Sequence, residues 1–406
     1  MIVATRGAVE GLEEFLAISA VADRPLHEVL ETFGERARKA FGAVRIMIGW
    51  RLLNPLFISQ SLYWRPETGV TMERWRVGEA MVSDAFLASP IHALLESEET
   101  EIRARLDRSN TPFAYPILET LAAEGCTDYF ISKVGFGHLP TATVKDRPGS
   151  GVILSFTSER EGGFNDDDMT ALRRLQYMLA LTTRSAMERD MRETLAATYL
   201  GGVAGERVLK GEITRGQGET INALIWYCDM RGSTELCEAL GVEAYIPVLN
   251  AYFSATAGPV KAAGGNVLDF IGDAVLAIFP LTEAGLSAAS AATEAVIVAL
   301  ERLRESEPAF AGRTSVADMT GIALATGPVV YGNIGIPERL TFSVIGPTVN
   351  AVARLENLTK TLREPVLATA DAAARLAGPG RRAMGEFVLP GQRAAQTVYA
   401  LNTGGR

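Results

Sequence analysis

The sequence predicts an α/β (α+β) protein made of two domains that a long helix connects. The chain has 406 residues, more than a single domain usually contains. Apolar residues make up 48% of it, which is enough for buried cores. Apolar positions recur at helical spacing through residues 165–200, and a glycine-rich stretch follows at 201–218. We therefore place the domain boundary in that stretch.

Composition and charge narrow the class of protein. The net charge is −9 and the pI is near 5.2, whereas broad nucleic-acid binding needs a basic footprint, so no nucleic-acid partner is expected. No apolar run approaches the roughly 18–20 residues of a membrane span, and the N-terminus lacks the apolar core of an export signal. Three cysteines are too few for a disulfide framework and fit a reducing compartment. These features predict a cytoplasmic protein without a membrane span.

The helix expected at residues 165–200 has a recognisable start. Asn165 is a suitable N-cap, and the three aspartates after it place negative charge at the positive end of the helix dipole. Its apolar stripe consists of Met169, Leu172, Leu175, Leu179, Met187, Met191 and Leu195. Two interpretations are open. The stripe pairs with a second copy of the chain, or it closes the first domain by packing on that domain's own sheet.

The part before this helix has the pattern of a mixed domain. Helical structure is expected at residues 15–41, and strands at 44–50, 129–134 and 151–157. Single residues that could hold a cofactor, His92, Cys126 and His138, are scattered and more typical of structural positions.

The end of this first part resembles the end of GAF-type sensor domains, in which a last strand and a loop lead into a closing helix. The resemblance covers mainly residues 125–190 and rests on residues 151–160, Phe164 and the acidic helix start. It implies a GAF-like regulatory domain at residues 10–164, controlled by an unknown small molecule or protein.

The second half carries chemistry, beginning with an apolar strand at 221–228 that ends on Asp229. The turn after it, MRGST at 230–234, leads into a helix expected at 235–240. Backbone N–H groups of such a turn can face phosphate oxygens while the carboxylate holds a cation. Taken alone, the aspartate could equally be an N-cap.

A second carboxylate lies at the tip of a hairpin. Two short apolar strands, 266–270 and 274–279, are joined through Asp273. Because both strands are nearly all apolar, we expect both to lie central in a sheet beside the 221–228 strand, which would place Asp273 next to Asp229. Adjacent carboxylates repel each other unless a divalent cation neutralises them, and hard oxygen ligands favour Mg²⁺ or Mn²⁺.

A third feature is a helix that begins at Pro347. Asn350 and Arg354 lie four residues apart, so both side chains project from one face. An amide and a guanidinium together can orient a ribose and neutralise a phosphoryl group during transfer. As a lone pair, the spacing is more typical of a solvated helix face.

Together these stretches resemble the catalytic domain of class III nucleotidyl cyclases, the adenylate and guanylate cyclases. The matching segments are YCDMRGST at 227–234, FIGDAVLAIF at 270–279 and IGPTVNAVAR at 345–354. They occur in the family's order and with similar spacing over residues 219–402. The resemblance implies a ferredoxin-like α/β core that works as a head-to-tail homodimer, with each active site at the interface.

The resemblance also implies roles for individual residues. Asp229 and Asp273 of one protomer, with Met230 beside them, would hold two Mg²⁺ or Mn²⁺ ions per active site. Asn350 and Arg354 of the other protomer would position the ribose and stabilise the transition state. The nucleoside triphosphate would lie against the rest of the turn and two base-reading positions: Arg231, Gly232, Ser233, Thr234, Asp269 and Ser343.

The base-reading positions depart from the family pattern. Adenylate cyclases usually carry Lys, and guanylate cyclases Glu, where this chain has Asp269. A carboxylate accepts hydrogen bonds, and guanine offers N–H donors on its Watson–Crick edge whereas the ring nitrogen of adenine does not. Ser343 favours adenine instead. We keep ATP narrowly ahead of GTP; a solvated Asp269 would leave selectivity loose.

Three hypotheses follow for function. The leading one is an active cyclase for second-messenger signalling, regulated through the 165–200 helix. The alternative is a catalytically silent cyclase-like module for nucleotide binding or dimerisation. Asp269 motivates it, as does Pro390, near which a phosphate-contacting Lys of many relatives is replaced and where Arg393 is not an equivalent substitute. A diguanylate cyclase or a polymerase palm is disfavoured because the hairpin reads IGDA and lacks a GGDEF-like signature.

Overall fold

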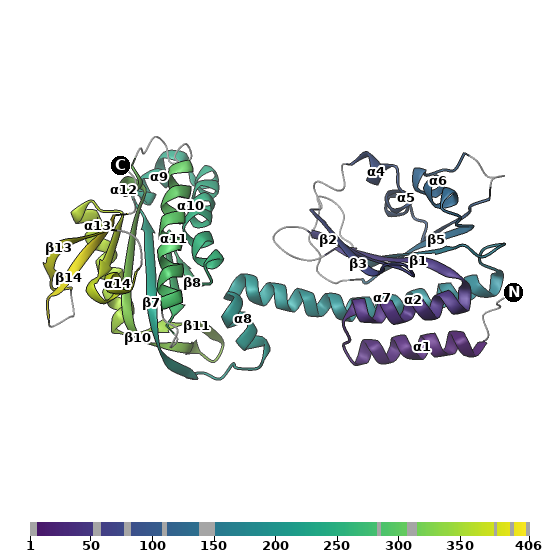
Figure 1. Cartoon of the computed structure of the whole chain (residues 1–406), viewed down its shortest axis with the longest axis horizontal. Coiled ribbons are helices and arrows are strands. Elements are labelled where there is room, and N and C mark those ends of the chain that lie inside the picture. The colour runs from purple at the N-terminus through teal and green to yellow at the C-terminus, as the bar shows by residue number, and fades with distance from the viewer. Residues whose placement is uncertain are drawn as a thin grey trace. The chain divides into compact units, whose positions relative to one another are not determined.

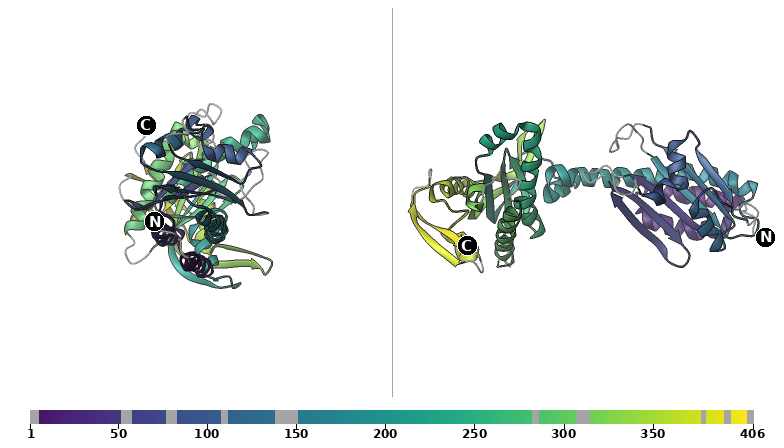
Figure 2. Two further views of the ribbon diagram at one scale, coloured as in Figure 1. Left: turned by 90° about the vertical axis from the view of Figure 1, so that its right-hand side faces the viewer. Right: turned by 90° about the horizontal axis from the view of Figure 1, so that it is seen from above.

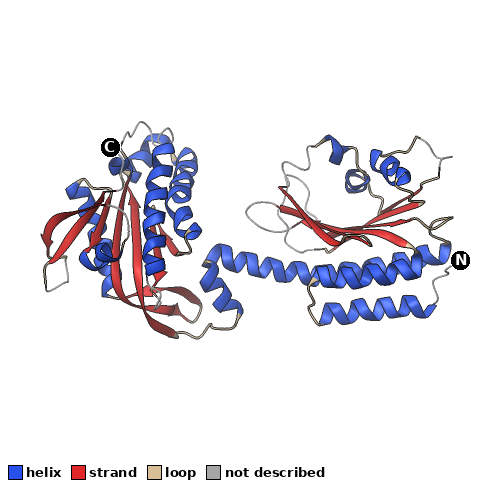
Figure 3. Cartoon of the chain, viewed as in Figure 1, coloured by secondary structure: helices blue, strands red, loops and turns tan. Residues whose placement is uncertain are grey.

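A computed structural model describes residues 6–51, 58–76, 83–107, 112–137, 151–281, 286–306, 315–376, 380–389 and 394–402. The chain divides into two units, Met1–Leu195 and Ala196–Arg406, and each is described by itself (Figures 1 and 3). None of the helices within these ranges combines the length and the apolar character needed to cross a membrane.

The N-terminal unit is built on a six-stranded antiparallel sheet with strand order β3-β2-β1-β6-β5-β4. The strands are β1 (Ala43–Arg51), β2 (Ile58–Arg65), β3 (Gly69–Arg76), β4 (Glu101–Arg105), β5 (Asp128–Gly135) and β6 (Gly151–Ser158). The three strands expected from sequence are therefore present. The helices are α1 (Arg6–Val21), α2 (Leu26–Phe41), α4 (Asp84–Leu87), α5 (Pro90–Glu96), α6 (Pro116–Ala123) and α7 (Asp166–Leu200).

Helices cover both faces of this sheet. The long helices α1, α2 and α7 lie on one face and the short helices α4, α5 and α6 on the other, and the end-on view in Figure 2 shows the same layers. The helical segment expected at 15–41 is in fact two helices, because the chain turns between Val21 and Leu26. Pro25, directly before α2, cannot continue a preceding helix, which accounts for the break.

The apolar stripe of α7 packs mainly on its own sheet. Met169, Leu172, Leu175 and Leu179 are almost fully buried, as is Met187, and they belong to one core cluster with residues of α2 and β1. Met191 and Leu195 farther along are only half-buried. The interpretation of α7 as a helix that closes the first domain therefore holds from its start through Met187.

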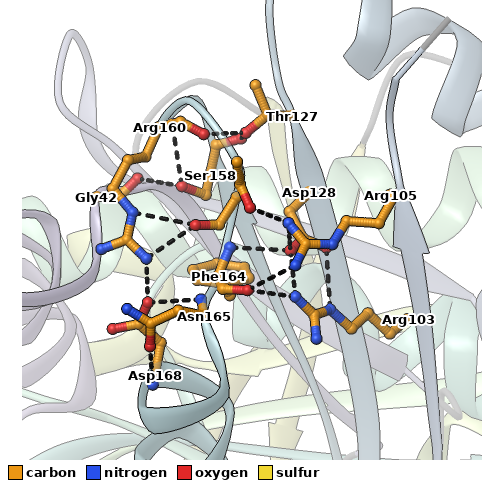
Figure 4. A network of polar contacts seen from close by, with 12 residues as sticks. Gly42, Arg103, Arg105, Thr127, Asp128, Ser158, Arg160, Phe164, Asn165 and Asp168 are labelled. Atoms are coloured by element: carbon orange, nitrogen blue, oxygen red, sulfur yellow. Dashed lines mark hydrogen bonds and ion pairs between the residues drawn. The ribbon is translucent and has the colours of Figure 1, made fainter. Parts of the chain in front are cut away.

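The start of α7 is fixed by a network of polar contacts (Figure 4). Asn165 caps the helix as expected: its Oδ1 accepts from the Asp168 N–H at 2.8 Å, and Asp168 Oδ2 accepts from the Asn165 N–H at 2.8 Å. Arg160 pairs with the fully buried Asp168. The buried Asp128 of β5 pairs with Arg103 of β4 at 2.7 Å and also accepts from the Phe164 N–H at 2.9 Å, just before the helix begins. The helix thus begins at a point tied to several strands.

The C-terminal unit contains an eight-stranded sheet with order β13-β14-β12-β10-β7-β9-β8, in which β11 pairs with β10. Its strands are β7 (Gly218–Met230), β8 (Asn266–Ile271), β9 (Ala274–Pro280), β10 (Thr320–Ile336), β11 (Arg339–Ile345), β12 (Val366–Thr369), β13 (Gly380–Phe387) and β14 (Gln396–Asn402). Its helices are α8 (Gly202–Leu209), α9 (Ser233–Leu240), α10 (Val242–Ala262), α11 (Leu286–Glu305), α12 (Val316–Met319), α13 (Pro347–Leu362) and α14 (Ala370–Arg375). Strands β10-β7-β9-β8 with their helical connections form the βαββαβ arrangement of a ferredoxin-like core.

Strand β7 separates the two core clusters of this sheet. Its even-numbered residues from Leu224 to Met230 face α10 and α11, whereas Ala223 and Ile225 face the cluster that contains α13. Successive side chains of a strand point to opposite faces, so the side chain of Asp229 emerges on the α13 side. This alternation decides which residues meet that carboxylate.

Two expectations from sequence are corrected. Strand β9 is central beside β7 as expected, but β8 is the edge strand, and Phe270 and Ile271 are about half exposed (50% and 49%). The apolar composition of β8 therefore does not mean that its side chains are buried. The glycine-rich stretch expected to be linker and turns contains the helix α8, and at Gly205 a Cβ would lie 2.7 Å from the backbone of Ala196. The glycine lets α8 pack closely on the last turn of α7.

Candidate active site

Asp229 and Asp273 meet at the end of the β7–β9 ladder. Cys228 pairs with Val275, so Asp229 comes next on β7 while Asp273 occupies the turn just before Ala274 on β9. Both residues are half-buried. Burial raises the pKa of Asp229, and the neighbouring Asp273 raises it further, although a hydrogen bond from Lys360 lowers it. The structure therefore brings together the two carboxylates that the sequence placed 44 residues apart (273 − 229).

A lysine from α13 contacts the first of these carboxylates. Lys360 Nζ lies 3.1 Å from Asp229 Oδ2 and 4.0 Å from Glu356 Oε2. The Glu356 side chain is only 3% exposed. Although burial opposes its charged form, Lys360 has a raised pKa because it donates to Asp229 and lies near Glu356. The site thus contains a resident cation that the sequence analysis did not identify.

Gly321 of β10 makes room for this arrangement. It pairs directly with Asp229 across the β7–β10 ladder. A Cβ at this position would lie 2.1 Å from Thr359 Oγ1 and 2.6 Å from Glu356 Oε1, distances that no side chain tolerates. Because Gly321 has no side chain, the turn of α13 that carries Glu356 and Thr359 can lie against the strands beside Asp229. The sequence signal that could have revealed this contact of Lys360 is the i, i+4 spacing of Glu356 and Lys360, two and six residues after Arg354.

The buried Glu356 makes stability depend on pH. Its pKa is raised to about 7, first by burial and then by Asp229, with Lys360 opposing the shift. A raised carboxyl pKa favours the folded state at low pH, and this contribution is lost as pH rises through about 7. The unfolding free energy of the original protein should therefore fall between pH 5 and pH 8. In Glu356→Gln we expect this fall to be smaller by on the order of 1–2 kcal/mol. Urea unfolding of both proteins in metal-free buffer measures it, and parallel pH profiles would contradict it.

Asn350 and Arg354 are not brought to the two aspartates within one chain. Both lie on α13, but Asn350 is ten residues and Arg354 six residues before Lys360. At 1.5 Å and 100° per residue, Asn350 lies about 15 Å along the axis, and Arg354 points about 120° away from Lys360. Neither side chain makes a hydrogen bond or ion pair with another residue that the structure describes. Their shared face is therefore available to something other than this protomer's own aspartates.

The turn after Asp229 connects β7 to α9. Gly232 has positive φ (58°) and precedes the first helical residue, Ser233. The Met230 side chain is buried in the core cluster, so only its main chain can serve a metal. Arg231 is half-buried and donates from Nη2 to the Glu364 carbonyl at 3.1 Å, which directs its guanidinium toward the end of α13. Thr234 is exposed.

The two base-reading candidates lie on strands that pack against each other. Asp269 is exposed on the edge strand β8, at a register shift in its pairing with β9. Ser343 is half-buried on β11, which contacts β8. Of the other positions singled out in the sequence, Pro390 and Arg393 lie outside the described residues, and so does His138.

The donor set fits a small divalent cation. Two adjacent carboxylates offer hard oxygen ligands and leave positions open for substrate, which is how Mg²⁺ is usually held at phosphate-transfer sites. Among the described residues, three or more His, Cys, Asp or Glu side chains do not converge on a common point, so the protein alone supplies few ligands. His92 instead lies 3.7 Å from Glu96 on its own helix, and Cys126 is buried.

Comparisons with known proteins agree with this geometry. Residues 217–403 match the family model described as "Adenylate and Guanylate cyclase catalytic domain". The chain is 31% identical over 167 residues to adenylate cyclase of Anabaena cylindrica, covering 40% of this chain and 32% of that protein. It is 31% identical over 181 residues to adenylate cyclase 2 of Rhizobium meliloti, covering 44% and 49%. The chain thus spans a third to a half of the length of these relatives.

A solved structure of a bacterial light-regulated adenylyl cyclase is also similar, at 27% identity, with a TM-score of 0.39, over 46% of this chain and 92% of that one. The matched region contains Asp229, Asp273, Asn350 and Arg354, and the N-terminal unit lies outside it. Residues 217–403 therefore form a class III nucleotidyl cyclase catalytic domain, homologous to adenylate cyclases.

Proposed function

We propose that the chain is an active cyclase that converts a purine nucleoside triphosphate to its 3′,5′-cyclic mononucleotide and pyrophosphate. The observation that carries this proposal is the convergence of Asp229 and Asp273 at the end of the β7–β9 ladder. Two adjacent carboxylates repel each other, and keeping both ionised is costly unless cations neutralise them. Of these two carboxylates, Lys360 contacts only that of Asp229, so the pair still offers carboxylate oxygens to a metal ion.

The metal positions follow from the same residues. Asp229 and Asp273 would hold Mg²⁺ or Mn²⁺, two ions per active site, with the Met230 main-chain carbonyl as a further oxygen. When bound, the ions lower the pKa of the ribose 3′-hydroxyl and neutralise the phosphate oxygens.

The remaining residues bind and orient the substrate. The ribose 3′-hydroxyl would give up its proton to solvent as its oxygen attacks the α-phosphorus. The bond from that phosphorus to the oxygen that bridges the α- and β-phosphates breaks, and pyrophosphate leaves with that oxygen. Arg354 would offset charge on the α-phosphoryl group during transfer, and Asn350 would hold the ribose. Gly232 and Thr234, with Arg231 and Ser233 in the same turn, would supply donors to the triphosphate.

A homodimer would complete the site. Asn350 lies far along α13 from its own chain's aspartates and Arg354 points to another side of the helix, so a second copy would have to supply both groups. Exposed apolar side chains support such an interface. They lie on the edge strand β8 and the nearby helix α10, and on the β10–β11 hairpin: Phe270, Ile271, Val242, Ile246, Ile336 and Ile345. A two-fold dimer of chains with one catalytic domain each has two equivalent sites.

For the substrate we favour ATP narrowly over GTP. Two relatives at 31% identity, from Anabaena cylindrica and Rhizobium meliloti, are named adenylate cyclases, and Ser343 suits adenine. Asp269 opposes this choice because a carboxylate suits the N–H donors of guanine, but its exposure on β8 lets it remain solvated. GTP therefore stays possible.

For the N-terminal unit we propose a regulatory role. Its antiparallel sheet between two helical layers supports the GAF-like resemblance, and α7 leads from this unit to the catalytic one. A small molecule or protein bound there would control cyclic nucleotide synthesis for intracellular signalling.

Product analysis tests the proposal. The purified full chain is incubated with ATP, GTP, CTP or UTP, first with Mg²⁺ and then with Mn²⁺. We expect cyclic AMP as the main product. Mainly cyclic GMP would mean that Asp269 reads the base edge. No cyclic product from any of the four, together with tight nucleotide binding, would overturn the enzymatic proposal in favour of a silent module.

A further inference from the structure

One ammonium group lies between two carboxylates at the proposed metal site. Lys360 Nζ is 3.1 Å from Asp229 Oδ2, which is hydrogen-bonding distance, and 4.0 Å from Glu356 Oε2. Asp229 is a proposed metal ligand, whereas Glu356 belongs to α13 and faces the same ammonium from one helical turn away. The lysine therefore has a second partner within reach of a small side-chain movement.

The two partners differ in how firmly the fold holds them. Glu356 is almost fully buried against Gly321, and Thr359 Oγ1 lies 3.4 Å from its Oε1. Lys360 is 46% exposed and has a flexible four-carbon stem. The carboxylate at Glu356 is thus fixed in place, and the ammonium is the group that can move.

A divalent cation on Asp229 and Asp273 would change the balance of charge around Lys360. A cation bound to Asp229 repels an ammonium on the same carboxylate, and this repulsion is strong in a partly buried site. The 4.0 Å separation from Glu356 gives the displaced ammonium a carboxylate that the metal does not use. Without Glu356, the lysine would have to keep competing for Asp229 or move fully into solvent.

We propose that Lys360 is a positioning residue that holds Asp229 while the metal is absent and transfers to Glu356 when a divalent cation binds. The inference rests on the proposed role of Asp229 and Asp273 as metal ligands. It makes metal binding an exchange of partners, in which an ion pair within the protein is replaced by the metal and a second ion pair takes over the lysine.

The exchange predicts a particular pattern of metal affinities. Lys360→Met removes the competitor, so the Kd for Mn²⁺ should fall about three- to tenfold. Glu356→Gln removes the receiving carboxylate while keeping the shape, so the Kd should rise by a similar factor. In the double variant no lysine is left for Glu356 to receive, so adding Glu356→Gln should have no effect. The Kd of the double variant should therefore match that of Lys360→Met alone.

The experiment measures Mn²⁺ binding to the full chain without nucleotide, using the electron paramagnetic resonance signal of free Mn²⁺. It is done at pH 8, where Glu356, whose pKa is raised to about 7, is mainly ionised. Lys360→Arg keeps the positive charge, so the Kd should not fall as it does in Lys360→Met. Lys210→Met removes the same charge elsewhere and should leave the Kd unchanged. Lys210 pairs with Glu206 on α8, and the neighbouring Arg207 pairs with Glu219, ten residues or about 33 Å before Asp229 on β7.

The possible outcomes separate this inference from the proposed function. If Asp229→Asn leaves Mn²⁺ binding unchanged, or the original chain binds none, the metal assignment fails and the inference with it. If Asp229→Asn weakens binding but Lys360→Met does not alter the Kd, only the role of Lys360 is overturned. If the effects of Lys360→Met and Glu356→Gln simply add, the transfer to Glu356 is overturned, because independent charges would behave in that way.

Discussion

Asp273→Ala should lower cyclic nucleotide production by on the order of 10³-fold or more. Asp273 lies in the β8–β9 turn, where it contributes one of two carboxylates beside the open end of β7. Its removal leaves Asp229 alone with Lys360, so that site would carry one proposed metal ligand and one competing cation. The rate of product formation under saturating Mg²⁺ or Mn²⁺ measures the effect.

A matched control separates lost chemistry from lost folding. Asp371→Ala removes an exposed carboxylate from α14 in the same unit and should leave the rate within about twofold. The Asp273→Ala protein should keep its melting temperature within a few degrees, about the range of a surface change. Turnover retained at more than about a tenth of the original rate would contradict the assignment of Asp273 to the metal site.

Two inactive chains should restore activity when they are combined. Asp273→Ala damages the aspartate half of the site and Arg354→Ala the α13 half. If each site takes its aspartates from one protomer and Arg354 from the other, a heterodimer of the two variants has one intact site and one doubly damaged site. With the variants co-expressed under different tags and purified through both, we expect about half the original activity per dimer.

The control for this experiment uses two lesions in the same half-site. A heterodimer of Asp229→Ala and Asp273→Ala has one aspartate missing at each site, so it should stay inactive. Arg304→Ala, an exposed arginine on α11, controls for loss of charge and should be active by itself. A mixed dimer no more active than its two parents would show that the site is not shared between protomers in this way.

Part of this site could be read from the sequence because local signals define it. The apolar run before Asp229 and the Gly-Asp tip between two apolar runs fix a strand end and a hairpin turn, whatever the rest of the chain does. Pro347 likewise marks the start of α13. The adjacency of Asp229 and Asp273 then needed only one further assumption, that the hairpin joins the same sheet.

The contacts of Lys360 could not be read in the same way. They depend on Gly321 lying opposite Asp229 in the β7–β10 register, and on α13 crossing the face of the sheet at that point. Neither is a local property of residues 350–360. The position of β8 could not be predicted either. An apolar run has the same sequence pattern whether the strand is central or lies at the edge of the sheet. The break between α1 and α2 is by contrast a local signal, because Pro25 stands directly before α2 and cannot continue a preceding helix.

The uninterrupted course of α7 has a consequence for how such domains can be recombined. The boundary between the units falls after Leu195, inside a helix that continues to Leu200 and against whose last turn α8 is packed at Gly205. Each residue added to or removed from a helix turns everything beyond it by about 100°, whereas seven residues nearly complete two turns. A unit grafted at this junction therefore has to match the helix in phase as well as in sequence.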